Sequence, residues 1–589
     1  MDMTALEVGE TVSGNRWLQK EYDSRLAMAI RQKFGLPEIV ARILASRSVG
    51  LEDVDVFLNP TLKNHLPNPF SLKDMEKSAH RMAQAILNRE PIGLMGDYDV
   101  DGATSTALLK MFLEKCDVPV YCFVPDREDG YGPNADKMKE FYEKGCRVVA
   151  TLDCGMTAFE PIAYGTQLGV DVIVLDHHDA DETRVPNAYA IVNPKRLDED
   201  AHHPCHYMAA VGVVFLFTVA LNAVLRKAGF YQDKTEPNLM EYLDLVAFGT
   251  VCDVVKLQGV NRLFVKSGLK QMKQGKNLGL RALAELVNLS EAPTSYHLGY
   301  VFGPRINACG RVGKSDIGMR LLSCHDSVEA GVLANELESL NLTRREIETA
   351  VLLEAIEQVE KEPIDTPFLV VEGENWHQGV VGIVAGRLKD KYNLPVFALS
   401  IENDEIKGSS RSVQGVDLGT LIMNAIQLGI LSRGGGHPMA AGFSLTKEKL
   451  PAFKAYLREN VKPEMISQDL SVVSVDAVLN LGGVNEALLE ALSLLAPYGE
   501  ANPEPKFVLK NVCVTRVNML KNGHISCTLT AQNGKSINAI AFRCVDTELG
   551  VCLLNMHQQY VHVLGTLKRD TWRGHTKIQF QITDMTRPV

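Results

Sequence analysis

LMGDYDVDGAT, at residues 94–104, places three aspartates at alternate positions between an apolar run and a glycine-containing turn. In an extended chain such residues share one face, so a strand that ends here would bring Asp97, Asp99 and Asp101 together. Three neighbouring carboxylates repel one another unless a cation lies between them. The stretch is therefore either a metal site at the end of a strand or a polar turn with solvated aspartates.

The pattern D-x-D-x-D-G also opens the calcium loop of the EF-hand, with Gly102 at its sharp turn. That loop requires a bidentate Glu at its twelfth position, which is Leu108 here. It also follows a helix, whereas PIGLMG at 91–96 is typical of a short strand. These two departures argue against calcium.

Length and composition indicate a globular protein of several domains. With 589 residues the chain exceeds one hydrophobic core and should hold about three or four domains. Its 46% hydrophobic and 23% charged residues are ordinary for a soluble protein. The N-terminus has no export signal, and the apolar run at 209–225 includes Thr218 and Asn222, which favours a buried helix over a membrane span. We expect a cytoplasmic protein without membrane association.

The cysteines give no sign of a disulfide framework or a zinc site. Twelve are scattered along the chain without a C-x-x-C pair, which favours reduced thiols. HHPCH at 202–206 has spacings that do not match standard zinc sites, so a polar loop is expected there.

Charge is unevenly distributed along the chain. The formal net charge is −11, yet residues 256–320 hold eleven Lys or Arg against three Asp or Glu. Such a stretch can bind a phosphate backbone inside an acidic protein, or can be the solvated face of helices.

From about residue 80 to 255, short apolar strands alternate with helical stretches, which predicts a mostly parallel sheet flanked by helices. Ligands of such sheets bind at the carboxyl ends of the strands. The predicted strands end in Asp97 and Asp99, in Asp153, and in Asp176 with the His177–His178 pair, and a later apolar helix ends at Asp253.

Carboxylates with one or two imidazoles are the ligands of Mn²⁺ and related divalent ions, and a set without cysteine disfavours structural zinc. Two ions about 4 Å apart would suit hydrolysis of a phosphodiester.

GDYDVDG, LDCG, LDHH and Asp253 together resemble the four motifs of the DHH phosphoesterase superfamily. GSSRS at 408–412 and SRGGGHPMAAGF at 432–443 resemble its associated domain, whose glycine-rich loop binds substrate. GPRINACGR at 303–311, WHQGVVGIVAGR at 376–387 and APYGEANPEPKF at 496–507 extend the resemblance from about residue 35 to the end. They are similar to the bacterial members that degrade single-stranded DNA from its 5′ end.

The resemblance implies two ions, Mn²⁺ or Mg²⁺, held by Asp97, Asp99, Asp153, His177 and Asp253. It implies catalytic roles for His177 and for His178 near the scissile phosphate, with Asp176 orienting the pair. Asp101 is expected either to cap the following helix or to orient a ligand.

Met95 departs from the pattern, because many relatives have His there. A thioether is a poor ligand for a hard ion, so one site would rely more on water or a neighbouring carboxylate.

A second group of residues is implied in substrate binding. Three glycines would let backbone N–H groups approach a phosphate, although a glycine triplet is also typical of a flexible turn. The arginines around PRINACGR would contact the strand or pin a structural turn. The expected substrate-binding residues are Arg305, Asn307, Arg311, Trp376, His377, Arg411, Ser412, Gly434, Gly435, Gly436 and His437.

The expected fold class is α/β, with a DHH-type parallel-sheet lobe and an associated α/β lobe joined by a long helix, plus a C-terminal OB-type β-barrel. In that barrel Phe507, Phe542, Trp572 and Phe580 would stack on bases or form the core. The expected domains are an N-terminal helical extension (1–75), the DHH catalytic domain with its basic helical part (76–335), the connecting helix (336–362), the substrate-binding domain (363–465) and the OB-type domain (466–589).

The sequence thus predicts a metal-dependent, single-strand-specific 5′-to-3′ DNA exonuclease that acts in recombination and repair. Its expected partners are single-stranded DNA, a single-strand-binding protein and a helicase, and we expect a monomer. Two alternatives stay open. The first is a DHH hydrolase for short oligonucleotides, cyclic dinucleotides or pyrophosphate, and the second is a replication scaffold without catalysis.

Overall fold

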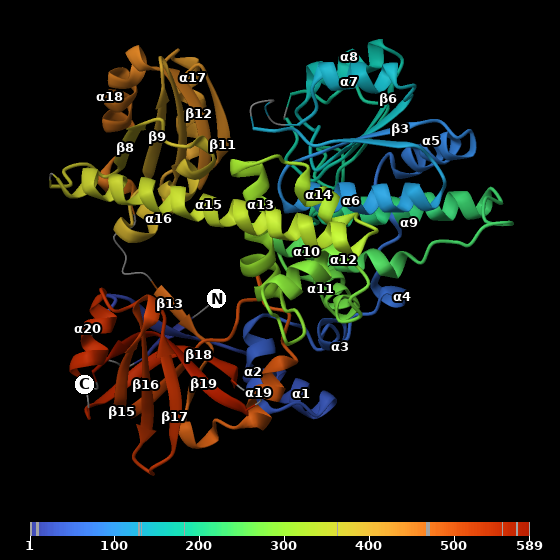
Figure 1. Cartoon of the computed structure of the whole chain (residues 1–589). Helices are drawn as coiled ribbons and strands as arrows, with labels where there is room; N and C mark the ends of the chain where they lie inside the picture. Colours follow the sequence, from blue (N-terminus) through green and yellow to red (C-terminus); the bar gives the residue numbers. More distant parts are fainter. Residues whose placement is uncertain are drawn as a thin grey trace. The chain divides into compact units, whose positions relative to one another are not determined.

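The computed structural model describes residues 3–6, 11–127, 130, 132–181, 183–361, 363–466, 472–556, 558–572 and 575–587. The chain forms two compact units (Figure 1). Unit 1 comprises residues 1–66, 256–263 and 469–589, and unit 2 comprises residues 67–255 and 264–468. Unit 1 therefore combines three separate stretches of the sequence.

The first lobe of unit 2 is built on a five-stranded parallel sheet in the order β4-β3-β5-β6-β7. Strands alternate with helices, as the apolar pattern predicted. The elements are η1 (Pro69–Ser71), α5 (Met75–Leu87), β3 (Ile92–Gly96), α6 (Val100–Lys115), β4 (Val120–Phe123), α7 (Ala135–Glu143), β5 (Val148–Leu152), α8 (Phe159–Gln167), β6 (Asp171–Leu175), β7 (Ala190–Val192) and α9 (Ala210–Lys227).

Strand register brings the polar strand ends to one edge of this sheet. Gly96 on β3 pairs with Leu152 on β5, and Leu152 pairs with Leu175 on β6. The next residue in each strand is an aspartate, so Asp97, Asp153 and Asp176 begin at the same level. Because the strands are parallel, all three lie at the carboxyl edge, where ligands bind in such sheets.

Helices cover both faces of the sheet (Figure 1). On one face Met138 and Phe141 of α7 and Ile162 of α8 pack against the buried strand residues in a single apolar cluster. On the other face α6 and α9 pack against β3, β5 and β6. Burial on both faces explains why the strands are apolar at nearly every position.

Helix α9 coincides with the apolar run and is a core helix. By length and composition alone it could cross a membrane, but 72% of its apolar window is buried inside the protein. The expectation of a buried helix is confirmed.

A helical part follows the sheet and leads into the long helix α15. Its elements are η2 (Leu239–Tyr242), α10 (Leu243–Cys252), α11 (Gly259–Met272), α12 (Leu278–Leu286), the π-helix η3 (His297–Phe302), α13 (Gly303–Val312), α14 (Ile317–Leu322) and α15 (Ser327–Glu360). The connecting helix was expected over 336–362, but α15 begins at Ser327. The side chain of Asp326 caps it there by accepting hydrogen bonds from the N–H groups of Val328 and Glu329.

The second lobe of unit 2 contains a mixed sheet in the order β11-β12-β10-β9-β8, in which only β8 and β9 are parallel. Its elements are β8 (Leu369–Glu374), α16 (Gln378–Tyr392), β9 (Val396–Glu402), β10 (Glu405–Arg411), α17 (Leu418–Gln427), β11 (Arg433–His437), β12 (Ala440–Thr446), η4 (Lys447–Lys449), α18 (Leu450–Asn460) and η5 (Pro463–Met465).

Unit 1 contains a closed barrel, in which β15 pairs with both β16 and β18. Two N-terminal strands join β13 in a small three-stranded sheet, a feature that the expected helical extension did not include. The elements are β1 (Met3–Ala5), β2 (Arg16–Lys20), α1 (Ser24–Phe34), α2 (Glu38–Ser46), α3 (Val54–Leu58), α4 (Leu62–His65), β13 (Val472–Val475), β14 (Ala477–Leu479), η6 (Leu481–Gly483), α19 (Glu486–Ser493), β15 (Phe507–Leu520), η7 (Lys521–Gly523), β16 (His524–Ala531), β17 (Ser536–Ala541), α20 (Glu548–Asn555), β18 (Tyr560–Trp572) and β19 (His575–Thr586). The expected fold class, two α/β lobes with a long helix and a C-terminal barrel, is confirmed.

Candidate metal centre and substrate pocket

The polar strand ends of unit 2 form a cluster of carboxylates and imidazoles suited to divalent ions. Among the described residues, three triads place one potential ligand atom from each member within 4.8 Å of the others. The triads are Asp153–His177–His178, Asp101–His177–Asp253 and Asp97–Asp99–Asp153. All five expected metal ligands therefore lie in one cluster.

His177 lies at the centre of the cluster. Its Nε2 atom is 3.3 Å from Asp153 Oδ1 and 3.6 Å from Asp253 Oδ2. Asp253 comes from the end of α10, so this imidazole links the helical part to the strand ends.

The cluster contains buried polar atoms that a cation would satisfy. In the described part of the chain, Asp97 Oδ1 and Asp253 Oδ2 are buried without a hydrogen-bond partner. Burial and the charge of Asp99 raise the pKa of Asp97 to about 8 and that of Asp253 to about 7. Burial and the charge of His178 lower the pKa of His177 to about 4, which keeps its imidazole neutral and able to bind a metal. This oxygen-rich donor set with one neutral imidazole fits Mn²⁺ or Mg²⁺.

Asp176 orients the histidine pair and lies outside the triads. Its Oδ1 accepts hydrogen bonds from the backbone N–H groups of His177 and His178, and lies 2.7 Å from His178 Nδ1. Burial would lower the pKa of His178, but the hydrogen bond and charge of Asp176 outweigh it and raise the pKa to about 9. Asp176 keeps its own pKa below the ordinary value, because His178 outweighs the effect of burial.

The GDYDVDG aspartates have different contacts, and the expected helix cap is not Asp101, which lies 3.8 Å from His177 Nε2 in the metal-competent cluster. Asp99, not Asp101, caps α6, because its Oδ1 accepts from the N–H groups of Asp101 and Gly102. Asp101 instead accepts from the N–H groups of Ala210 (2.6 Å) and Val211 (2.9 Å) at the start of α9. Asp101 thereby ties the start of α9 to the metal centre, which local spacing could not reveal because the partner is over 100 residues away.

Two backbone positions in the centre have unusual conformations. Asp153 and Val254 have φ of 61° and 58°, in the left-handed region that non-glycine residues rarely adopt. Both lie at or directly after a candidate ligand, where such strain often orients a functional side chain.

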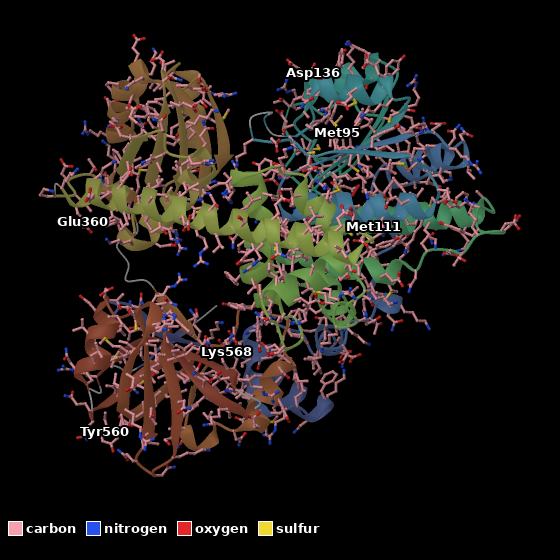
Figure 2. All side chains as sticks on the ribbon, in the orientation of Figure 1. Met95, Met111, Asp136, Glu360, Tyr560 and Lys568 are labelled. Atoms are coloured by element: carbon pink, nitrogen blue, oxygen red, sulfur yellow. The ribbon has the colours of Figure 1, made fainter. Side chains whose placement is uncertain are left out.

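Met95 is a core residue of the first lobe, in which Figure 2 labels it. Its side chain is buried in the apolar cluster with Phe141 and Met156. Its neighbours in that cluster are apolar side chains.

A pocket of about 460 Å³ opens directly beside the metal centre. Asp97 and Asp99 line one side, and residues of α13, α16 and β10 line the other. Of the expected substrate-binding residues, Asn307, Arg311 and Arg411 line this pocket. Burial and the neighbouring arginines lower the pKa of Arg311 to about 10, so this cationic pocket is suited to stabilise an anion.

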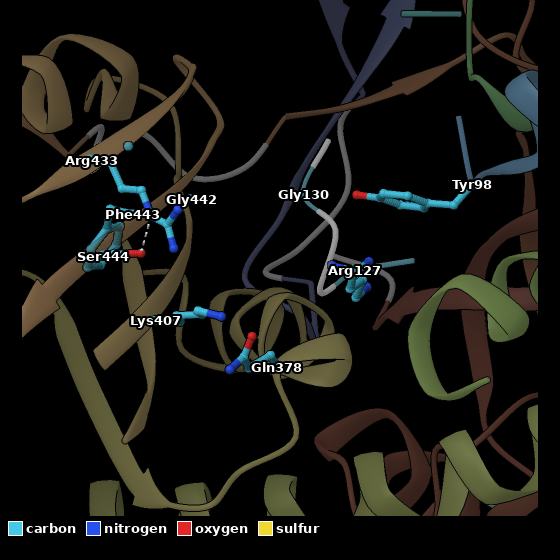
Figure 3. Close-up of a pocket in the computed structure, with 10 residues that line it drawn as sticks. Tyr98, Arg127, Gly130, Gln378, Lys407, Arg433, Gly442, Phe443 and Ser444 are labelled. Carbon is cyan, nitrogen blue, oxygen red and sulfur yellow. Dashed lines mark hydrogen bonds between the residues drawn. The ribbon is translucent and has the colours of Figure 1, made fainter. Parts of the chain in front are cut away.

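Sequence reasoning missed further lining residues, and those with long polar side chains are Tyr98, Arg127, Gln378 and Lys407. They also line the adjoining pocket drawn in Figure 3, where Arg433 Nε approaches Ser444 Oγ at 3.4 Å. The Arg127 guanidinium lies over the Tyr98 ring, 4.9 Å from its centroid. No local pattern distinguishes Tyr98, Arg127 or Lys407 as lining residues, because only folding brings them together around the pocket.

Four expected substrate-binding residues have partners within the protein. Arg305 forms an ion pair with Glu338 at 2.7 Å, and Trp376 is buried in the second lobe with its indole N–H on Glu354. Ser412 is buried and donates to the Val416 carbonyl, and His377 caps α16 by accepting from the Gly379 N–H.

The glycine triplet is a strand and not a flexible loop. Residues Arg433–His437 form β11, which pairs only with β12 in the described sheet. Close packing explains two of the glycines: a Cβ at Gly436 would lie 2.3 Å from the Ala440 carbonyl oxygen, and one at Gly434 would lie 2.9 Å from that of Gly442. A Cβ at Gly435 would meet nothing within 4 Å. Gly434 lines the adjoining pocket, whereas His437 is exposed and accepts from the Met439 N–H.

Much of the basic stretch is neutralised locally. Lys276 pairs with Glu241, and Arg281 with Glu285. Arg262 is buried in unit 1, where it donates to backbone carbonyls. The stretch is therefore less positive as a surface than its composition suggests.

In the barrel, Phe507 and Phe580 are buried core residues, so the core alternative holds for them. Phe542 is exposed and packs edge-on against His524. The side chain of Trp572 lies outside the described residues.

Family models match three parts of the chain: the DHH family, N-terminal domain at residues 91–250, the DHHA1 domain at 365–462 and the RecJ OB domain at 475–584. The chain is 36% identical over 490 residues to the single-stranded-DNA-specific exonuclease RecJ of Escherichia coli, covering 80% of this chain and 83% of that protein. It is 32% identical over 577 residues to the RecJ of Bacillus subtilis, covering 97% and 70%.

Solved structures agree with this relationship. The crystal structure of RecJ in complex with Mn²⁺ from Thermus thermophilus matches with a TM-score of 0.80 and 29% identity, covering 97% of this chain and 80% of that chain. The Mg²⁺ complex of the same protein matches with a TM-score of 0.75 and 28% identity, covering 97% and 78%. The matched DHH, DHHA1 and OB domains follow one another along the chain, and alignments over most of the chain to several RecJ proteins exceed 30% identity. The chain therefore belongs to the RecJ family.

Proposed function

We propose that the chain is a metal-dependent exonuclease specific for single-stranded DNA, which hydrolyses phosphodiester bonds from the 5′ end and releases mononucleotides. One observation carries the proposal. Asp97 and Asp99 belong to the metal-competent cluster and also line the cationic pocket, so a phosphate in that pocket would lie beside the ions. The Mn²⁺ and Mg²⁺ complexes of the Thermus thermophilus RecJ support these ions as cofactors.

In this proposal Asp97, Asp99, Asp153, His177 and Asp253 hold two ions. Ions bound there would polarise the scissile phosphodiester and lower the pKa of the attacking water. Asp101 and Asp176 act through their neighbours, the first by fixing the start of α9 and the second by orienting the histidines.

His178 is the side chain of the pair that can reach substrate. It is 47% exposed, while Asp176 behind it is 1% exposed. The hydrogen bond and charge of Asp176 raise the pKa of His178, and a protonated His178 would donate a hydrogen bond to a phosphate oxygen.

Arg127, Arg311, Lys407 and Arg411 bind the 5′ phosphate in the pocket that they line. A terminal phosphate carries more charge than an internal one, so this cationic pocket favours a 5′ end over the middle of a strand. In this way the pocket sets the direction of cleavage.

We assign catalysis to residues 76–335, substrate binding to 363–465 and strand retention to the barrel within 466–589. Because the enzyme requires single strands, a helicase and a single-strand-binding protein are the partners that we propose, with the enzyme acting as a monomer in cytoplasmic recombination and repair.

The test uses 5′-labelled and 3′-labelled single strands, duplexes and dinucleotides, each incubated with the protein and Mn²⁺ or Mg²⁺. We expect labelled mononucleotide from 5′-labelled single strands at the earliest times and little cleavage of duplex. Cleavage of dinucleotides alone would favour the small-substrate hydrolase, and strand binding without cleavage would favour the scaffold.

Asp153→Asn tests the metal centre in the same assay. Asn tolerates the left-handed φ of 61° at this position but is a weaker ligand, so we expect activity to fall roughly 100-fold or more while strand binding persists. Asp233→Asn, at an exposed position of the same unit, is the matched control and should retain full activity.

A further inference from the structure

Two exposed tyrosines lie between α12 and α13, outside the metal centre and the pocket. Tyr296 and Tyr300 are 59% and 75% exposed, and their ring centroids are 5.3 Å apart. His297 adds a third ring, edge-on to Tyr296 with centroids 5.8 Å apart. Neighbouring aromatic rings left in water mark a binding surface, since scattered single apolar residues are the ordinary case on protein surfaces.

The π-helix η3 fixes the orientation of this pair. Leu298 and Phe302 face inward and are buried, with the Phe302 ring edge-on to Phe248 of α10. Tyr296 and Tyr300 therefore face outward on the opposite side of the same turns. Such turns are rare and occur frequently at functional sites.

Helix η3 packs against the end of α10 that leads to the metal centre. Cys252 Sγ donates to the Leu298 carbonyl at 3.4 Å, and a Cβ at Gly299 would lie 3.5 Å from Val251 Cγ1. The residue after Cys252 is Asp253, a candidate metal ligand. The tyrosine pair is thus anchored to the same helix end as the metal centre, within unit 2.

We propose that Tyr296 and Tyr300 form a stacking platform for bases of the single-stranded substrate outside the bond being cut. The inference rests on the proposed function and deepens it. Single strands present unpaired base faces, and aromatic rings stack on them with little sequence preference. A duplex keeps its base faces covered, so the platform adds to the preference for single strands.

The test compares a 20-nucleotide single strand with a 5′-phosphorylated dinucleotide, which spans only the bond being cut, both with Mn²⁺. The double variant Tyr296→Leu/Tyr300→Leu keeps apolar bulk but removes the rings, and Tyr296→Phe/Tyr300→Phe keeps the rings. We expect the Leu variant to raise KM for the 20-mer about ten-fold or more, as for the removal of one stacked base, with dinucleotide kinetics unchanged. The Phe variant should resemble the wild type.

Leu353→Ala removes another exposed apolar side chain, 62% exposed on α15, and should change neither substrate's kinetics. Unchanged 20-mer kinetics in the Leu variant, or an equal loss on both substrates, would overturn the platform. A wild-type protein that cleaves no single strand would instead contradict the proposed function, so the two failures are distinguishable.

Discussion

Asp244 is a buried carboxyl group outside the metal centre, at the start of α10, and it makes stability depend on pH. It is 2% exposed, and its hydrogen bond in the described structure comes from the Leu245 N–H. Burial raises its pKa from 3.8 to about 7. Since the folded pKa exceeds the unfolded one, the folded state binds the extra proton, and stability falls as pH rises from about 4 to about 7.

Asp244→Asn removes this penalty while keeping the oxygen that accepts from Leu245. We expect the variant to match the wild type near pH 3 and to exceed its free energy of unfolding by on the order of 4 kcal/mol at pH 8, since each pH unit between the two pKa values is worth about 1.4 kcal/mol. Urea unfolding at several pH values measures this difference. An equal gain at every pH would show that Asp244 does not titrate in this range.

Strand β11 offers a matched pair of glycines for separating packing from substrate binding. A Cβ at Gly436 would lie 2.3 Å from a backbone oxygen, whereas one at Gly435 would meet nothing within 4 Å. We expect Gly436→Ala to cost about 1–3 kcal/mol of unfolding free energy and Gly435→Ala to leave the melting temperature unchanged. If a phosphate approaches the backbone at 435, Gly435→Ala should still raise KM for single strands roughly ten-fold.

Melting curves and KM for both variants test this pair together. A stable Gly435→Ala variant with unchanged KM would show that the substrate does not approach the backbone at residue 435.

The elements also show how far the sequence alone could lead. Alternating strands and helices predicted the parallel sheet, and the strand-end rule placed Asp97, Asp153 and Asp176 at one edge, because both depend on local periodicity. For RGGGH the resemblance implied a loop, and a glycine triplet is also typical of a flexible turn, whereas the structure has strand β11, in which the contact that requires glycine at 436 comes from Ala440 after the turn. Arg127 and Lys407 were missed because only folding brings them to Asp97.

Unit 1 depends on contacts between distant parts of the chain that no local pattern reveals. The Trp17 indole N–H donates to Asp584 Oδ2 at 2.9 Å, which joins the first strands to the last. Arg262 joins the middle of the chain to both ends of the sequence within unit 1. Its guanidinium donates to the carbonyls of Phe57, Leu495, Ala496 and Pro497. Its guanidinium also lies over the Phe57 ring, 3.7 Å from the centroid.

Arg262→Met therefore tests whether this part of the basic stretch serves DNA or the fold. The variant leaves several buried carbonyls without their donor, so we expect a loss of roughly 3 kcal/mol or more of unfolding free energy. Lys270→Met is the matched control on the same helix, because Lys270 is exposed and has no ion-pair partner among the described residues. We expect that control to keep full stability.

Titrating strand affinity against salt separates the two roles, since removing one side chain that binds a phosphate lowers the salt slope by about 1. Arg262→Met should leave the slope unchanged at temperatures where it is folded. A lower slope with normal stability would instead place Arg262 on the DNA, which its burial against four carbonyl groups argues against.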